Sequence, residues 1–69
     1  MSEITLKAAR VNANLTLEDV SKEVGISVPT LSKWENYKKF PTARQLKTLC
    51  GLYGRSMDDI FVPDSLTEG

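Results

Sequence analysis

Residues 16–41 read TLEDVSKEVGISVPTLSKWENYKKFP, and this stretch predicts a pair of short helices joined by a tight turn at Gly25. Apolar residues recur at helical spacing before and after the turn: Leu17, Val20, Val24, Leu31 and Trp34. Gly25 readily takes the left-handed conformation that ends a helix, and Ile26 fills the turn. Ser21 lies where the helices would touch, and its small side chain permits close approach. The stretch therefore predicts two helices that cross at a fixed angle.

The second helix of this pair, about residues 28–36, is expected to turn a short and basic face outward. Since Leu31 and Trp34 have the spacing of an inward face, helical geometry directs another set of residues away from the core. These residues are Val28, Pro29, Ser32, Lys33 and Asn36.

Capping residues divide the rest of the chain into further short helices. A Ser or Thr side chain that can accept a backbone N–H begins each one: Ser2, Thr16, Ser27, Thr42 and Ser56. Residues able to end a helix follow four of them: Asn14, Gly25, Gly54 and Pro63. No stretch alternates apolar and polar residues as a strand would. We therefore predict an all-α fold, a compact bundle of five short helices with a central helix-turn-helix.

The length and composition predict one small domain. Its 69 residues are 41% hydrophobic and 26% charged, which is an ordinary globular balance. We expect residues 1–63 to form the domain and residues 64–69 a flexible C-terminal tail. Cys50 is the lone cysteine, so no intramolecular disulfide can form, and the N-terminus has no apolar run for a signal peptide or membrane span. We expect a cytoplasmic protein that does not bind membranes.

Charge is unevenly distributed along a chain whose formal net charge is zero. Residues 33–47 carry five basic residues against Glu35, a local charge of +4, whereas residues 56–69 carry four acidic residues and a local charge of −4. A charge run is more often a solvated face than a binding site, so polarity alone decides little. It gains meaning because the basic segment includes the outer face of the second helix.

The quoted stretch, within residues from about Leu6 to Phe61, resembles the lambda-repressor-like helix-turn-helix family of the Cro/CI, or XRE, type. The resemblance implies a DNA-binding domain whose second helix lies in the major groove. It implies a base-reading role for four residues: Val28, Pro29, Ser32 and Lys33. It places phosphate contacts at seven others: Thr16, Ser27, Asn36, Lys38, Lys39, Thr42 and Arg44.

The resemblance further implies a partly buried ion pair between Arg10 and Glu35. Two residues depart from the family pattern. Tyr37 stands where relatives commonly have glycine, and Leu17 stands where they often have a glutamine that holds a phosphate. These departures leave the loop geometry around Lys38 open and mean that one anchoring contact is missing or replaced.

The sequence favours a binding protein over an enzyme, with no cofactor, metal or small-molecule ligand. It has no histidine, no glycine-rich phosphate loop and no metal-ligand spacing. We expect a sequence-specific transcriptional regulator, a repressor, that binds double-stranded operator DNA with an inverted repeat as a homodimer. The residues expected at the dimer interface are Met57, Ile60, Phe61 and Val62, although Ile60 and Phe61 could instead close the core.

Two alternatives remain open at this point. The same fold could serve as a protein-interaction module of the antirepressor kind, because Pro29 and Leu17 replace polar groups that DNA-binding relatives often use. The chain could also be the antitoxin of a toxin–antitoxin pair, which would still bind DNA. Nothing in the sequence separates an antitoxin from a repressor.

Overall fold

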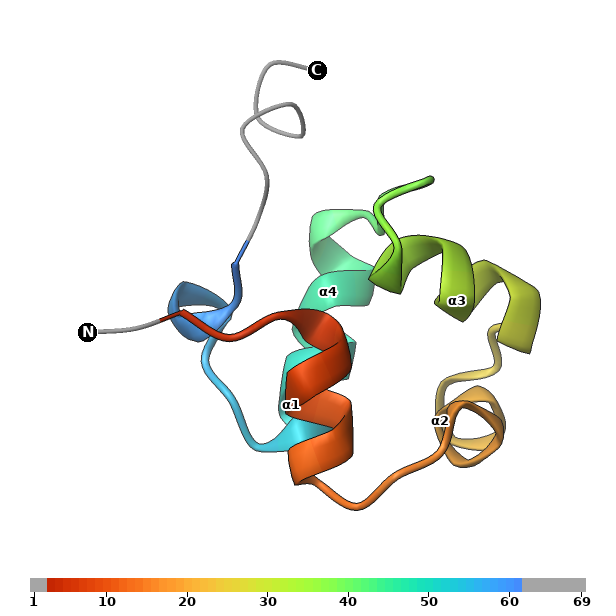
Figure 1. The fold of residues 1–69 in the computed structure, drawn as a ribbon, viewed down its shortest axis with the longest axis horizontal. Coiled ribbons are helices and arrows are strands. Elements are labelled where there is room, and N and C mark those ends of the chain that lie inside the picture. Colours follow the sequence, from red (N-terminus) through yellow and green to blue (C-terminus); the bar gives the residue numbers. More distant parts are fainter. Residues whose placement is uncertain (1–2, 62–69) are drawn as a thin grey trace.

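Four α-helices and one 3-10 turn make up residues 3–61, the part of the chain that the computed structural model describes (Figure 1). Their bounds are α1 Leu6–Asn12, α2 Leu17–Val24, α3 Val28–Glu35, α4 Ala43–Tyr53 and η1 Met57–Asp59. The predicted all-α class is confirmed, and the fifth element is a single 3-10 turn in place of a helix. The expected tail, residues 64–69, and the expected helix end at Pro63 lie outside the described residues.

Hydroxyl caps begin the helices where local sequence predicts them, with one exception. Thr16, Ser27 and Thr42 precede α2, α3 and α4, and each side chain accepts a backbone N–H from three residues on. The expected start at Ser2 is wrong, because α1 begins only after Thr5, whose hydroxyl accepts from Ala8 N at 3.1 Å.

A two-residue pairing between the two ends of the chain explains why α1 begins late and why η1 is short. Ile4 N donates to the Asp59 carbonyl at 2.8 Å, and Phe61 N donates to the Ile4 carbonyl at 2.8 Å, so Ile4 and Ile60 form an isolated parallel bridge. These bonds require extended backbone at both positions. The helix expected from Ser56 to Pro63 therefore gives way to extended structure at Ile60.

Left-handed residues end the four helices. Asn14, Gly25 and Gly54 take positive φ angles of 61°, 72° and 73°, as predicted for helix ends. The fourth is Tyr37, with φ of 59°, which follows α3. In three cases the next residue donates its N–H back into the helix, and Lys38 N reaches the Lys33 carbonyl at 2.9 Å in this way.

One hydrophobic core joins all four helices and the residue after η1. It comprises Leu6, Ala9, Val20, Leu31, Trp34, Leu46, Leu49, Cys50, Tyr53 and Ile60. Trp34 and Cys50 are thus core residues, and burial raises the pKa of the Cys50 thiol. Among the described residues, no helix has the length and apolar character needed to cross a membrane.

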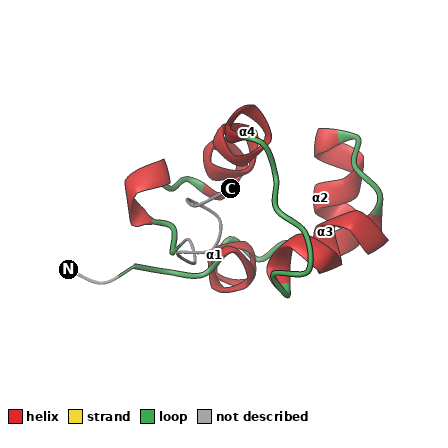
Figure 2. Cartoon of the chain, turned by 90° about the horizontal axis from the view of Figure 1, so that it is seen from above, coloured by secondary structure: helices red, strands yellow, loops and turns green. Residues whose placement is uncertain are grey.

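The helix pair α2 and α3 lies at one end of the molecule. In both views α1 and α4 lie side by side in the middle, α2 and α3 lie together at one end, and η1 lies at the opposite end (Figures 1 and 2). The outer face of α3 is therefore remote from the acidic turn that carries Asp58 and Asp59.

Candidate nucleic-acid interface

The outward face of α3 carries the four candidate base-reading residues. Pro29 and Lys33 are exposed, whereas Val28 and Ser32 are half-buried beside them. The inner face of the same helix is fixed by Leu31 and Trp34, both in the core. Pro29 is compatible with the helix because it occupies the first turn, where backbone N–H groups have no partner within the helix. A rigid helix thus presents a short face with one cation.

Close packing of α2 on α3 fixes the angle of this face. Val20 of α2 is fully buried, and Leu17 and Ile26 pack against the same core. The Gly25 N–H donates to the Ser21 carbonyl at 2.9 Å, and this hydrogen bond closes the turn. Leu17 therefore has a packing role, in place of the polar contact common in the family it resembles.

An ion pair holds the end of α3 against α1. Arg10 Nε lies 2.7 Å from Glu35 Oε2, Arg10 Nη2 donates to Oε1 at 3.2 Å, and Arg10 Nη1 donates to the Leu15 carbonyl at 2.9 Å. The side chains are only 11% and 8% exposed, and the hydrogen bond to Glu35 raises the pKa of Arg10. Arg10 is consequently committed to the fold and not available to a phosphate.

The N-termini of α2 and α4 each have a capping box, but the two helix starts differ in charge. At α2, the backbone N–H of Thr16 donates to Asp19 Oδ2 at 2.9 Å and completes the capping box. This hydrogen bond lowers the pKa of Asp19. Glu18 adds a second acidic group in the first turn. A phosphate approaching Thr16 would therefore meet two carboxylates, which offset the favourable helix dipole.

At α4 the box is neutral. Gln45 Oε1 accepts from the N–H of Thr42 at 2.8 Å, the first turn has no acidic residue, and Arg44 is exposed within it. The helix dipole and Arg44 both favour an anion here. Of the two helix starts, that of α4 is electrostatically the more favourable for an anion.

The loop after α3 carries the remaining candidates. Lys38 and Lys39 are exposed, and their backbone N–H groups reach the Lys33 carbonyl at 2.9 and 3.4 Å. The Asn36 side chain folds back, with Nδ2 donating to the Ser32 carbonyl at 2.9 Å. Ser27 is exposed at the start of α3, where its hydroxyl donates to Thr30 Oγ1 at 2.9 Å. Asn36 and Ser27 would have to exchange internal bonds for a phosphate contact.

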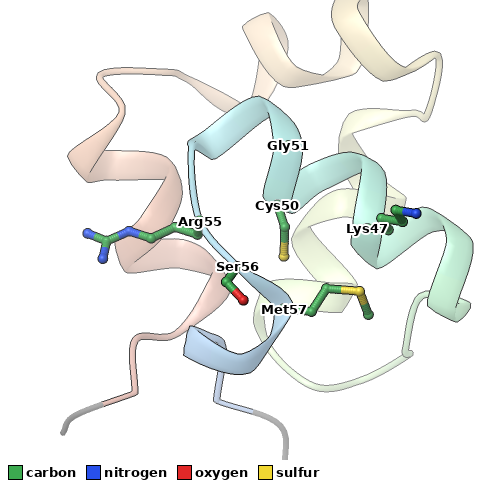
Figure 3. A pocket seen from close by; sticks show the side chains of 6 residues that line it. All are labelled: Lys47, Cys50, Gly51, Arg55, Ser56 and Met57. Atoms are coloured by element: carbon green, nitrogen blue, oxygen red, sulfur yellow. The ribbon is translucent and has the colours of Figure 1, made fainter.

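The candidates for a dimer interface separate into two groups. Met57 and Phe61 are 37% and 40% exposed, whereas Ile60 is only 3% exposed and belongs to the core; Val62 lies outside the described residues. Beside Met57 a shallow hollow of about 330 Å³ opens between α4 and η1 (Figure 3). Its lining is Lys47, Cys50, Gly51, Arg55, Ser56 and Met57.

Two features of the structure were not predicted from the sequence. Thr5 was missed as a cap because Ser2 satisfies the same rule. The contact of Phe61 with Tyr37 was missed because it joins residues distant in the chain, although the tyrosine in a glycine position was a signal that something unusual supports the loop.

Comparison with known proteins gives a family match over the described helices. A family model described as "Helix-turn-helix" matches residues 6–60. The HTH-type transcriptional activator BcrR of Enterococcus faecalis is 28% identical over 61 residues, which cover 88% of this chain and 30% of the relative. The chain therefore spans less than a third of the length of that relative. No solved structure gives a significant match.

Proposed function

The chain belongs to the helix-turn-helix family of the lambda-repressor-like type, and we propose that it is a sequence-specific transcriptional regulator that binds operator DNA. The observation that carries the proposal is α3. One face of this helix is fixed in the core by Leu31 and Trp34, while the opposite face exposes Pro29 and Lys33 at the end of the molecule remote from its acidic turn.

Each residue on the outer face of α3 has a chemistry suited to a base edge. Lys33 can donate to the O6 and N7 acceptors of guanine, and the apolar Val28 and Pro29 suit a thymine methyl group. The Ser32 hydroxyl can serve several bases, since it both donates and accepts. We therefore propose that Lys33 makes the one specific hydrogen-bonding contact and that the residues around it make less specific contacts.

Phosphate contacts position the domain along the groove. The N-terminus of α4 with Thr42 and Arg44 supplies one, and Lys38 and Lys39 supply others from the loop after α3. Thr16, Ser27 and Asn36 contribute less, because their polar groups are already bonded and α2 begins with two acidic residues. Affinity should then fall with salt by a slope of about −0.9 per phosphate neutralised.

Two copies of the domain give useful specificity. One short helix contacts few base pairs, so we propose a homodimer on an inverted repeat with half-sites about 10 base pairs apart. Of the described residues expected at the interface, Met57 is exposed and available to a second copy, whereas Phe61, although exposed, packs on Tyr37 of its own chain. The sign of regulation is proposed as repression, which operator occupancy alone can produce. The relative from Enterococcus faecalis is named an activator, but it is about three times as long as the matched region.

Selection of bound duplexes from a randomised pool, at about 0.1 M salt, tests the proposal and does not require that the operator be known. Enrichment of an inverted repeat is the expected result. Retention of DNA without any enriched sequence would overturn it and would favour the protein-interaction module on the same fold. A promoter fusion carrying the enriched site then gives the sign, since repression lowers reporter output when the protein is present.

A further inference from the structure

Tyr37 occupies a backbone conformation that its side chain disfavours. Four helices end in left-handed residues, and the other three are Asn14, Gly25 and Gly54. Glycine tolerates positive φ because it has no Cβ atom, and asparagine because its short polar side chain can form local hydrogen bonds. Tyrosine has neither property, so its Cβ atom crowds the neighbouring carbonyl there without compensation. Hydrogen bonds from the Lys38 and Lys39 N–H groups to the Lys33 carbonyl accompany the φ of 59° at Tyr37, and a contact of the tyrosine ring adds to them.

The Tyr37 ring is held by the C-terminal end of the described chain. It packs edge-to-face on Phe61, with ring centroids 6.1 Å apart and planes at 78°. Phe61 is itself fixed, because its N–H donates to the Ile4 carbonyl at 2.8 Å and the preceding Ile60 is buried. Edge-to-face pairs prefer this separation and angle. Residues far apart in sequence thus brace the loop after α3.

This brace acts on the ring and not on the hydroxyl. Within residues 3–61 the Tyr37 phenol oxygen is buried and makes no hydrogen bond. The residues that follow, Lys38 and Lys39, are exposed, and their N–H groups are tied to the Lys33 carbonyl. The position of both lysines is therefore set from two sides, by the end of α3 and by the Tyr37 ring.

We propose that Tyr37 and Phe61 form a ring clamp that positions Lys38 and Lys39 for DNA phosphates, so that the segment at Phe61 is part of the DNA-binding apparatus. The inference rests on the proposed function. It makes Tyr37 and Phe61 positioning residues that touch no DNA themselves. It also gives a reason for a tyrosine with positive φ at this position, since the ring that causes the strain is the ring that Phe61 contacts.

The salt dependence of binding to the duplex recovered by selection tests the clamp. Tyr37→Gly removes the ring and also relieves the left-handed strain, so its loss of function cannot be ascribed to backbone strain. Phe61→Ala removes the other ring. Each should make the slope of log affinity against log salt shallower by about 1–2, the loss of one or two phosphate contacts. The double variant should go no further, because each single change already opens the clamp.

Two further variants separate the clamp from simpler effects. Tyr37→Phe keeps the ring and should restore the slope of the parent, and Val11→Ala removes an exposed apolar side chain on α1 as a matched control that should leave the slope unchanged. An unchanged slope in Tyr37→Gly would overturn the clamp. So would a loss in Phe61→Ala alone, which would indicate a dimer contact. If the parent protein selects no duplex, the proposed function fails before the clamp is tested.

Discussion

Arg10 and Glu35 connect α1 to the last turn of α3 by an ion pair with two hydrogen bonds between the side chains. Water is largely excluded from both groups, so neither charge is well solvated if its partner is removed. Periodicity alone does not predict such a pair, since both residues are charged and lie 25 positions apart. It was inferred only from a resemblance to the family.

Glu35→Ala should lower the free energy of unfolding by about 3–5 kcal/mol, because it leaves the Arg10 guanidinium without its counter-charge. Urea denaturation followed by circular dichroism measures the change. Glu23→Ala, which removes an exposed carboxylate on α2, is the control and should stay within about 0.5 kcal/mol of the parent. Equal stability of the two variants would show that the pair does not hold α3 in place.

The raised pKa of Tyr53 determines how its ionisation affects stability at alkaline pH. Burial, with a further contribution from the Glu35 charge, raises the pKa of Tyr53 from 10.0 to about 12. Between these values the unfolded chain loses the phenol proton while the folded chain keeps it, so the free energy of unfolding falls as pH rises above about 10. Below that pH both states are protonated and this contribution to stability is fully present.

Urea midpoints of the parent and of Tyr53→Phe, measured from pH 8 to 11, test this expectation. The difference between the two proteins should be constant up to about pH 9.5 and then change, because only the parent loses stability to the ionisation of Tyr53. Parallel curves across the whole range would contradict a raised pKa at Tyr53. The comparison cancels the contribution of Cys50, which both proteins retain.

Local capping rules predicted most helix boundaries, because the decisive atoms lie within a few residues of each other. Thr16, Ser27 and Thr42 begin helices as expected. The rules failed at both ends of the domain, where a pairing between Ile4 and Ile60 sets the backbone. A pairing across most of the chain leaves no local pattern in the sequence.

Two glycines should respond in opposite ways to alanine. Gly25 has φ of 72° at the end of α2, so Gly25→Ala should cost about 1–2 kcal/mol of stability. Gly51 lies inside α4, and a methyl group there would meet no atom within 4 Å apart from its chain neighbours and the backbone of its own helix. Gly51→Ala should therefore stabilise the protein by about 0.5–1 kcal/mol. Thermal melts should show a lower melting temperature for Gly25→Ala and a higher one for Gly51→Ala. A stabilising Gly25→Ala would show that the turn does not need its left-handed residue.

The whole molecule separates its charges although its net charge is zero. The basic segment follows α3 into the start of α4, while the described acidic residues after Ser56 lie on the turn at the other end (Figure 1). Helical periodicity was sufficient to predict which face of α3 points outward. The bracing of Tyr37 by Phe61 depends on the assembled fold, so the sequence did not reveal it.

A homodimer is the expected assembly of the regulator. Met57→Asp should weaken it, because the change buries a charge in an apolar interface while leaving the core untouched. Sedimentation equilibrium at tens of micromolar, run in the absence and in the presence of DNA, should give a dimeric mass for the parent in at least one of the two conditions. The variant should give a lower average mass in that condition. A monomeric parent under both conditions would contradict the proposed dimer.

Selection from a randomised duplex pool, carried out with the parent and with Lys33→Ala, tests whether α3 reads the DNA sequence. Lys22→Ala, which removes an exposed lysine on α2, is the control. The parent and the control should enrich the same inverted repeat, and Lys33→Ala should enrich that repeat with one position relaxed in each half-site. An identical repeat from Lys33→Ala, with every position equally strict, would contradict the assignment of Lys33 as the residue of α3 that distinguishes bases.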